Sequence, residues 1–329
     1  MFKGKKILIT GGTGSLGKAL AKRLLELDAD IVRIFSRNEN NQTTMESEFD
    51  DDRLRYFIGD VRDLPRLIKA MEDVDIVYHA AALKHVPVVE YNPFEAIKTN
   101  VLGSQNVIDA CLHENIETVV CVGTDKAVSP LNTYGATKLL MEKLFVTASN
   151  YTNRERHKTK FIAIRYGNVL GSSGSVVPTL LKQIESGRNI TITDPNMTRF
   201  YITMNQALDF IIRSSKKGNG GEVFIPKLKA YSLGILKEAI LEVLEKDVKT
   251  ELISVRPGEK YHESLISSEE IRNTFEDKDD YVILEDSLQN NIKTKKSTLT
   301  NQYSSDVVEC LTKKELKKIL IEEKLVSTK

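Results

Sequence analysis

Short apolar runs alternate with longer amphipathic stretches through the first half of the chain. Val, Ile, Leu and aromatic residues cluster in runs whose length is typical of buried strands, and stretches with helical spacing separate them. The runs lie at residues 6–10, 31–35, 54–59, 75–81, 118–123 and 160–167. Strands that alternate with helices form parallel sheets built from βαβ units. The pattern therefore predicts an α/β protein with a doubly wound parallel sheet.

The stretches between the runs have the period of helices that cover a sheet. Residues 17–27 and 103–115 each place apolar side chains on one face. The second half of the chain is less regular, with Gly- and Pro-containing loops between helical segments. We therefore expect a sheet domain at 1–168, to which residues 201–217 return, and a smaller α/β domain formed mainly by 169–329.

Composition and charge limit the classes of partner. The 329 residues include 47 basic and 46 acidic ones, so no overall field attracts nucleic acid or an anionic membrane. No apolar run approaches the roughly 20 residues that a membrane-spanning helix needs. The three cysteines lack metal-ligand spacing and indicate reduced thiols. We expect a cytoplasmic protein that binds neither nucleic acid nor membranes.

A glycine-rich segment joins the first predicted strand to the first predicted helix. In ITGGTGSLG, the residues Gly11, Gly12, Gly14 and Gly17 satisfy both G-x-x-G-x-x-G and G-x-G-x-x-G. Glycines there permit a tight turn, allow backbone amides to approach a pyrophosphate, and let the helix pack closely on the strand. A glycine turn without a ligand is the alternative. The position directly after an N-terminal strand favours a dinucleotide in a Rossmann domain.

The end of the second predicted strand indicates which nicotinamide dinucleotide binds. NAD sites place a carboxylate there for the ribose 2′-hydroxyl, whereas an arginine accommodates the 2′-phosphate of NADP. Ser36 and Arg37 end this strand, and Glu39, the alternative carboxylate, lies past it. The sequence therefore predicts NADP, with Asp60 and Val61 beside the adenine.

A tyrosine and a lysine follow the fifth predicted strand. Tyr134 and Lys138 lie one helical turn apart, so their side chains share a helix face, and Thr124 ends the strand before them. A nearby cation stabilises phenolate, so we expect the pKa of Tyr134 to fall from about 10. With the glycine turn, this set resembles the extended short-chain dehydrogenase/reductase superfamily, in which the Thr, Tyr and Lys perform the acid–base chemistry of hydride transfer.

The strand end Thr-Asp-Lys at residues 124–126 narrows the resemblance. Related dehydratases of hexose nucleotides carry Thr-Asp-Glu there. The chain resembles the UDP-N-acetylglucosamine 4,6-dehydratases through this segment and through HAAALKHVP (79–87), KTNVLGSQNV (98–107), RYGNVLGSSGSVVP (165–178), MTRFYIT (197–203) and RPGEKYHE (256–263). Gly123 departs from the family, which commonly has Ser before Thr-Asp-Lys.

The resemblance implies a lyase that uses redox chemistry within its cycle. Tyr134 would take the proton of the sugar C4 hydroxyl while the hydride goes to NADP, and the ketone then acidifies the C5 proton. Asp125, kept protonated by burial, would protonate the C6 hydroxyl. Lys126 would remove the C5 proton, with its pKa lowered by desolvation and by Lys138. Water leaves, the hydride returns to C6, and the tightly bound NADP is regenerated.

The tyrosine also favours inversion at C5. Many enzymes of the retaining branch replace it with methionine and often carry a membrane segment, whereas the soluble inverting enzymes begin pseudaminic acid biosynthesis. Inversion needs an acid and a base on opposite faces of the ring, and Lys126 and Tyr134 are the candidates. UDP-N-acetylglucosamine would give UDP-2-acetamido-2,6-dideoxy-β-L-arabino-hexos-4-ulose. Retention at C5 is the alternative.

The resemblance assigns further residues to the two ligands. Expected cofactor contacts also include Thr13, Ser15, Leu16, Ala80, Ala81, Lys84 and Asn100. Expected substrate contacts, in the second domain and the loop after the fourth strand, are Lys84, His85, Asn168, Ser175, Val176, Arg199, Arg256 and Glu259. Arginines suit bidentate recognition of the UDP pyrophosphate, and structural ion pairs are the alternative for them. The histidines lack ligand spacing, so we expect no metal. A homo-oligomer, from a dimer to a hexamer, is also implied.

Other functions fit parts of this sequence. A UDP-sugar C4 epimerase or reductase would use Thr124, Tyr134 and Lys138 but needs no acid–base pair at 125 and 126. A redox-sensing or scaffold protein would bind NADP without turnover. Asp125 and Lys126 in isolation fit a surface ion pair. Their position at the carboxyl end of a strand, where doubly wound sheets bind ligands, favours the catalytic interpretation.

Overall fold

A large, mostly parallel sheet forms the centre of the computed structural model, which describes residues 2–151, 157–172, 174–284 and 294–326. The parallel strands are β1 (Lys6–Thr10), β2 (Ile31–Ser36), β3 (Leu54–Ile58), β4 (Ile76–His79), β5 (Thr118–Val122), β6 (Lys160–Ile164) and β10 (Val223–Pro226). Antiparallel strands β14 (Thr274–Glu276), β15 (Asp280–Ile283) and β16 (Lys295–Lys296) extend one edge. The strand order is β16-β14-β15-β10-β6-β5-β4-β1-β2-β3. The doubly wound parallel sheet predicted from the sequence is confirmed.

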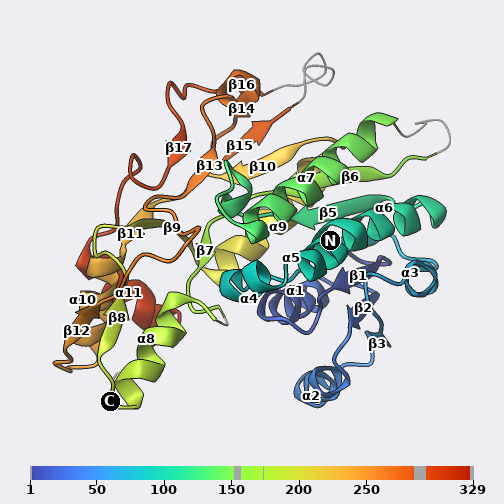
Figure 1. Ribbon diagram of the computed structural model, residues 1–329. Helices are drawn as coiled ribbons and strands as arrows, with labels where there is room; N and C mark the ends of the chain where they lie inside the picture. The colour runs from blue at the N-terminus through green and yellow to red at the C-terminus, as the bar shows by residue number, and fades with distance from the viewer. Residues whose placement is uncertain (1, 152–156, 173, 285–293, 327–329) are drawn as a thin grey trace.

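Helices cover both faces of this sheet (Figure 1). They are α1 (Ser15–Glu26) and α9 (Met204–Lys217) on one face, and α3 (Leu64–Met71), α6 (Gly103–His113) and α7 (Thr133–Tyr151) on the other. In β1, Ile7 and Ile9 pack with α1 and α9, whereas Leu8 packs with α3, α6 and α7. All three side chains are fully buried. Since both faces of its strands are covered, a parallel sheet has continuous apolar runs, which is the pattern seen in the sequence.

Strands from the second half of the chain join the same sheet. β10 pairs with β6, where Val223 lies opposite Ala163, although no strand of this sheet is predicted beyond residue 170. A four-residue strand between irregular loops has too little periodicity to be recognised alone. The domain boundary at residue 168 remains a prediction.

The remaining elements are short helices and turns beside the sheet and the helices and strands of a smaller C-terminal lobe. Beside the sheet lie α2 (Glu39–Phe49), α4 (Val86–Tyr91), α5 (Pro93–Ala96), the π-helix η1 (Ile97–Leu102) and the 3-10 turns η2 (Asp125–Ala127) and η3 (Ile271–Asn273). The lobe contains α8 (Val176–Glu185), α10 (Leu233–Val243), α11 (Lys313–Glu322), β7 (Asn168–Val169), β8 (Ile190–Ile192), β9 (Thr198–Ile202), β11 (Ala230–Ser232) and β12 (Thr250–Leu252), with β13 (Ser264–Ile266) and β17 (Tyr303–Ser304) where it meets the sheet. Leu236 and Ile240 of α10 pack with Leu316 and Leu320 of α11 in its core.

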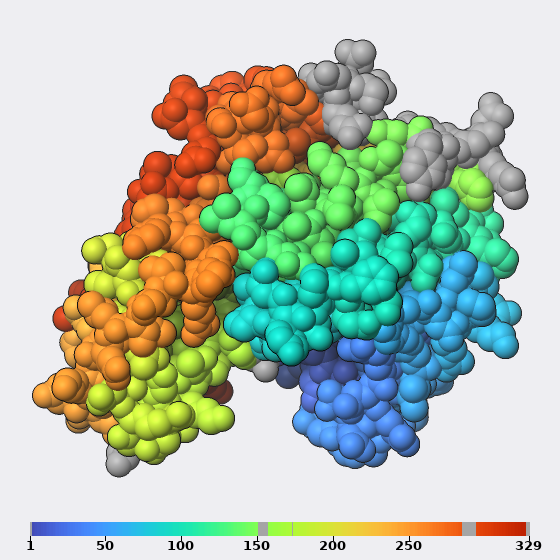
Figure 2. Space-filling model, in the orientation of Figure 1, coloured from blue at the N-terminus to red at the C-terminus, as the bar shows by residue number. Residues whose placement is uncertain are grey.

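Figure 2 shows a hollow between the lobe and the N-terminal part of the sheet domain. Across the described ranges, no helix combines the length and apolar character that would let it cross a membrane. Those ranges also contain no group of three or more His, Cys, Asp or Glu side chains that could hold a metal ion.

Candidate active site

The glycine turn after β1 aims the first amides of α1 at a cavity. Gly11 has a φ of 69°, and a Cβ there would lie 2.9 Å from the backbone of Ala81. A Cβ on Gly17 would lie 2.5 Å from the carbonyl oxygen of Gly12. Only glycine therefore allows β1, β4 and α1 to approach so closely. The amides and the dipole at the start of α1 favour an anion there.

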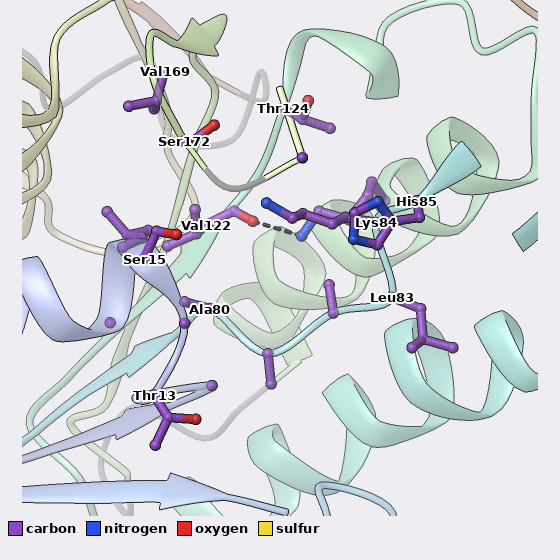
Figure 3. Close-up of a pocket in the computed structure, with 18 of the residues that line it drawn as sticks. Thr13, Ser15, Ala80, Leu83, Lys84, His85, Val122, Thr124, Val169 and Ser172 are labelled. Atoms are coloured by element: carbon purple, nitrogen blue, oxygen red, sulfur yellow. Dashed lines mark hydrogen bonds between the residues drawn. The ribbon is translucent and has the colours of Figure 1, made fainter. Parts of the chain in front are cut away.

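A cavity of about 620 Å³ lies at the carboxyl ends of the parallel strands. Most of the predicted cofactor residues line it, namely Gly11, Thr13, Gly14, Ser15, Leu16, Ser36, Arg37, Asp60, Val61, Ala80, Ala81, Lys84, Tyr134 and Lys138. It is also lined by Thr124, Asp125, Lys126, His85, Asn168 and Ser175. Figure 3 shows Thr13 and Ser15 facing Lys84 and His85 across this space. The fold thus gathers the predicted catalytic residues and most predicted ligand contacts around one cavity.

Two predicted contacts lie just outside the lining. The Asn100 side chain accepts from the Leu83 amide at 2.8 Å and donates to the Leu83 carbonyl at 3.0 Å. Asn100 therefore holds the loop after β4, which itself lines the cavity. Val176 begins α8, and the residue before it, Ser175, reaches the lining.

The predicted arginines and Glu259 form contacts away from the lining. Arg199 is buried, donates to the Tyr261 carbonyl at 3.0 Å and forms an ion pair with Glu259 at 3.3 Å. Arg256 is exposed, and its backbone amide donates to Glu259 at 3.3 Å. In this structure Arg199 and Glu259 form the structural ion pair that the sequence left as an alternative.

The loop after β2 forms the end of the cavity where the sequence predicts the adenosine ribose. Arg37 and Asn38 line this end, together with Asn41 from the first turn of α2. The Arg37 guanidinium lies 3.8 Å from the Asp60 carboxylate, and 54% of its side chain is exposed. Glu39 is exposed at the start of α2 and is not part of the lining. A cation, rather than the alternative carboxylate, therefore borders this end of the cavity.

Helix α7 carries Tyr134 and Lys138; Lys138 is buried, and Tyr134 is partly exposed to the cavity that it lines. The Lys138 ammonium donates to the Val122 carbonyl at 2.6 Å, and burial lowers the pKa of Lys138 to about 8. Burial raises the pKa of Tyr134 to about 12, and Lys126 is the cation that partly offsets this rise. The lowered Tyr134 pKa predicted from Lys138 is therefore wrong for this arrangement.

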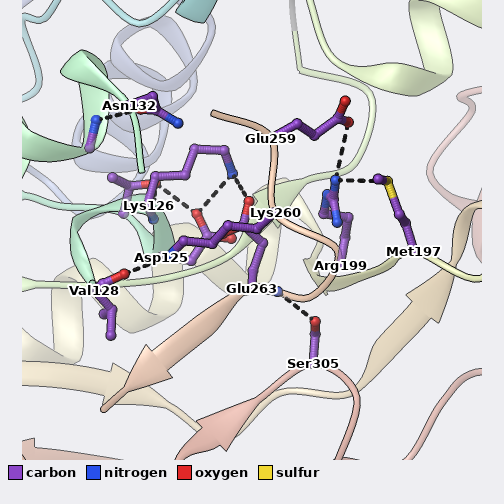
Figure 4. A network of polar contacts seen from close by, with 12 residues as sticks. Asp125, Lys126, Val128, Asn132, Met197, Arg199, Glu259, Lys260, Glu263 and Ser305 are labelled. Carbon is purple, nitrogen blue, oxygen red and sulfur yellow. Dashed lines mark hydrogen bonds and ion pairs between the residues drawn. The ribbon is translucent and has the colours of Figure 1, made fainter. Parts of the chain in front are cut away.

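The 3-10 turn η2 after β5 places Asp125 and Lys126 against Glu263 (Figure 4). The Thr124 hydroxyl accepts from the Lys126 amide at 3.4 Å and donates to the Asp125 carboxylate at 2.9 Å. The Lys126 ammonium lies 3.1 Å from Asp125 Oδ1 and 3.0 Å from Glu263 Oε1. The Asp125 and Glu263 side chains are 1% and 4% exposed. Asp125 and Lys126 are thus part of an acid–base group in which the carboxylates are buried and the lysine is partly exposed, and they do not form a surface ion pair.

Burial and mutual attraction set the protonation of this group. Burial raises the pKa of Asp125, attraction to Lys126 opposes the rise, and repulsion from Glu263 adds to it. Burial alone would lower the pKa of Lys126, but the two carboxylates outweigh it and raise that pKa. Burial alone would raise the pKa of Glu263, but the charges of Lys126 and Arg199 outweigh burial and lower that pKa. The direction of the Asp125 pKa shift agrees with the predicted protonated carboxyl. The lowered Lys126 pKa is wrong, because two carboxylates face this ammonium.

Several buried polar atoms at the site have no hydrogen-bond partner within the described part of the chain. They are Asp125 Oδ2, Glu263 Oε2, Asn168 Oδ1 and Ser175 Oγ. Buried polar atoms are normally paired, so such atoms beside a cavity indicate a ligand or water. Asn168 and Ser175 come from the lobe side of the cavity, opposite the glycine turn.

The sequence analysis missed Glu263 as a functional residue. Glu263 ends the segment RPGEKYHE, and only the packing of β13 against η2 brings it to Lys126. A buried carboxylate cannot be told from an exposed one in so polar a segment. The sequence analysis also missed other lining residues, among them Asn38, Asn41, Tyr166 and Met204.

Comparison with known proteins finds two relatives that are named as nucleotide-sugar enzymes and one solved structure with a very similar fold. The chain is 48% identical over 285 residues to the UDP-N-acetylglucosamine 4,6-dehydratase (inverting) of Campylobacter jejuni, covering 86% of this chain and 84% of that protein. It is 39% identical over 331 residues to the UDP-glucose 4-epimerase of Rickettsia massiliae, covering 98% of this chain and 96% of that protein. The X-ray structure of Pen from Bacillus thuringiensis matches with a TM-score of 0.93 and 41% identity, covering 99% of this chain and 100% of that one.

The family is established over most of the chain. The model for the family described as polysaccharide biosynthesis protein matches residues 7–285, which include the glycine turn, the acid–base group and Glu263. The resemblance stated from the motifs is confirmed at this level. The chain belongs to the polysaccharide biosynthesis protein family.

Proposed function

We propose that this protein is a UDP-N-acetylglucosamine 4,6-dehydratase that inverts C5 and holds NADP tightly. The pair formed by the buried Asp125 and the partly exposed Lys126, in one cavity with Tyr134 and Lys138, carries the proposal. An epimerase only oxidises and reduces C4, which leaves that pair without a role, whereas dehydration needs a base for C5 and an acid for C6. The 48% identity to the inverting dehydratase of Campylobacter jejuni supports the same assignment.

The residues of the glycine turn and of the loop after β2 fit NADP. Backbone amides at the start of α1 suit the pyrophosphate, and the tight packing at Gly11 and Gly17 keeps side chains out of its way. Arg37 and Asn41 supply donors for the 2′-phosphate, with Glu39 outside the lining. When bound there, NADP would supply the hydride-transfer chemistry that oxidation at C4 and reduction at C6 of the sugar require.

Tyr134, as the phenolate, takes the proton of the C4 hydroxyl. A side-chain hydrogen bond with Thr124 and the charge of Lys126 both lower its pKa against the effect of burial. Lys138, held on the Val122 carbonyl, has a pKa of about 8 and can exchange a proton near neutral pH. These three neighbours prepare the phenol for proton transfer.

Asp125 and Lys126 perform the elimination. The C5 proton goes to the amine form of Lys126, and the proton of the Asp125 carboxyl goes to the C6 oxygen, so that the C6–O bond breaks and water leaves. Burial favours the protonated form of Asp125 that this step requires. Inversion follows when C5 is reprotonated from the opposite ring face, which we assign to Tyr134.

The lobe side of the cavity would hold the UDP group. The unpaired Asn168 Oδ1 and Ser175 Oγ suit a uridine, and Lys84 and His85 line the cavity near the position expected for the sugar. Arg199 and Arg256 would have to rearrange from their present contacts to meet the pyrophosphate.

A homo-oligomer is also part of the proposal. Apolar side chains are exposed on α4, α5, η1, α7 and the loop before α7, namely Val88, Tyr91, Phe94, Leu102, Leu140 and Leu131. Exposed apolar groups on neighbouring elements favour a protein partner, and a second copy is the simplest one. Sedimentation equilibrium of the purified protein measures the assembly, and a monomer at all concentrations would contradict it.

Proton NMR in deuterated water tests the function. Purified protein is mixed with UDP-N-acetylglucosamine without added NADP. We expect a 4-keto-6-deoxy sugar with deuterium at C5 and the ring couplings of the L-arabino isomer. D-xylo couplings with deuterium at C5 would show the retaining reaction, and a C4 epimer would show the epimerase. Unchanged substrate, even with NADP supplied, would refute the substrate assignment.

A further inference from the structure

Glu263 lies in the acid–base group but has no part in the reaction described above. Its Oε1 lies 3.0 Å from the Lys126 ammonium, and Oε2 has no hydrogen-bond partner within the described residues. Its backbone amide donates to Ser305 Oγ at 2.9 Å, which fixes the segment before β13 (Figure 4). Burying a charged carboxylate without a partner costs considerable folding free energy, so Glu263 depends on its contact with Lys126.

Charged groups face Glu263 from each element packed around it. Lys126 comes from η2, Arg199 from β9 and Lys260 from the same loop as Glu263. Arg199 is already paired with Glu259, and the Lys260 ammonium donates to the Val128 carbonyl at 2.5 Å.

The Glu263 carboxylate in turn influences two groups on the other side of Lys126. It raises the pKa of Asp125 on η2 and that of Tyr134 on α7. The Lys126 ammonium lies between the two carboxylates and contacts both Glu263 and Asp125 directly.

We propose that Glu263 is a positioning residue for the dehydration: it holds the charge of Lys126 so that Asp125 keeps its proton, and it accepts the Lys126 proton when Lys126 must act as a base. This inference rests on the proposed function. Two buried carboxylates facing one ammonium leave an excess negative charge, which a proton on one carboxylate removes. Glu263 Oε1 lies as close to the ammonium as Asp125 Oδ1 does, at 3.0 against 3.1 Å, and Arg199 and Lys260 also favour a charged Glu263, so we assign the proton to Asp125.

The proton transfers balance through the elimination. A proton leaves the Lys126 ammonium for Glu263 Oε1, which neutralises both groups. The Lys126 amine then takes the C5 proton, while Asp125 gives its proton to the C6 oxygen and water leaves. Asp125 becomes a carboxylate beside the new ammonium, 3.1 Å away in the present geometry. The proton on Glu263 returns through Lys126 to Asp125 and restores the starting state.

Difference infrared spectroscopy tests the protonation without any substrate. We expect the full-length protein at neutral pH to show the band of a protonated buried carboxyl, which shifts when aspartate side chains carry a heavy carbon isotope. Glu263→Gln loses this band, because Lys126 then pairs with Asp125 alone. The exposed Glu269→Gln, six residues along the same segment, keeps the band. Persistence of the band in Glu263→Gln, or its absence from the wild type, would overturn the proposal.

Kinetics then test the role in elimination. Glu263→Gln is expected to lower kcat roughly 100-fold, with KM unchanged, and to let the reduced nicotinamide accumulate, because oxidation at C4 proceeds while elimination is slow. The alkaline limb of the kcat–pH profile moves to lower pH, since Asp125 ionises more readily without the repulsion from Glu263. Glu263→Asp, which keeps a carboxylate, recovers part of the rate.

The outcomes separate this proposal from the proposed function. An unmoved pH profile, with oxidation and elimination slowed equally in both Glu263 variants, would assign Glu263 a structural role only. Wild-type protein that leaves UDP-N-acetylglucosamine unchanged would refute the proposed function, and the infrared result would still decide whether Glu263 keeps the proton on Asp125.

Discussion

Two ionic groups in this protein have the same number of charges of each sign but different surroundings. In each, two carboxylates meet one cation: Arg165 with Glu142 and Glu270, and Lys126 with Asp125 and Glu263. Arg165 donates to both oxygens of Glu142, each at 2.6 Å. It also donates to both oxygens of Glu270, at 3.0 and 2.7 Å.

The difference lies in how completely each group is paired. The Arg165 group lies between β6, α7 and the segment before η3, away from the cavity, and its guanidinium cannot lose a proton. The Lys126 group borders the cavity and leaves one oxygen on each of Asp125 and Glu263 without a partner in the described chain. A saturated group stabilises the fold, whereas an unsaturated group with a titratable cation can transfer protons.

The largest expected effect is the loss of stability in Arg165→Met. Glu142 would be left buried beside Glu270 without a cation, and breaking a buried pair in this way costs about 3–5 kcal/mol. Urea unfolding measures the change, with the exposed Arg188→Met as the matched control. A loss below about 1 kcal/mol would contradict the structural role given to this group.

The next effect is the loss of turnover in Asp125→Asn. The amide is nearly isosteric and cannot give the proton that the C6 oxygen needs, so kcat should fall roughly 100-fold or more. The free energy of unfolding should change by less than about 0.5 kcal/mol, because burial already favours the uncharged form of Asp125 and Lys126 keeps its ion pair with Glu263. A stability loss as large as that of Arg165→Met would contradict the claim that the Arg165 group stabilises the fold and the Lys126 group does not.

A smaller effect is expected at the ribose end of the cavity. Arg37→Ala removes the cation assigned to the 2′-phosphate, and the Kd for NADP should rise roughly tenfold while that for NAD stays nearly constant. Isothermal titration calorimetry on protein stripped of cofactor measures both constants, with the exposed Arg55→Ala as control. Equal changes for the two dinucleotides would remove the support for NADP.

The smallest effect concerns a third cation, the buried Lys138, whose ammonium meets a backbone carbonyl instead of a carboxylate. Burial lowers its pKa from 10.5 to about 8, so between these values the unfolded chain binds a proton that the folded protein lacks. The contribution of Lys138 to stability therefore rises with pH across this window, by at most about 1.4 kcal/mol per pH unit. Urea unfolding at several pH values should show a slope that is more positive in the wild type than in Lys138→Met, and the difference between the two slopes measures this contribution. Identical slopes would argue against the lowered pKa.

Much of the fold could be predicted because the parallel sheet is covered on both faces. Its central strands had to be apolar at every position, and Ile7, Leu8 and Ile9 show that pattern in consecutive residues. The short strand β10 and the antiparallel edge could not be predicted, since their partners are distant in the sequence and three or four residues carry little periodicity.

The sequence by itself determined the glycine turn, the sheet that carries it, and the residue types at the end of β5. Those are local requirements: glycine where a Cβ would collide, and an acid beside a base in adjacent positions. Only the tertiary structure decided the protonation of that acid and base. Glu263 reaches Lys126 from a segment 137 residues away, and a pKa depends on burial and on neighbouring charges that the linear sequence does not reveal.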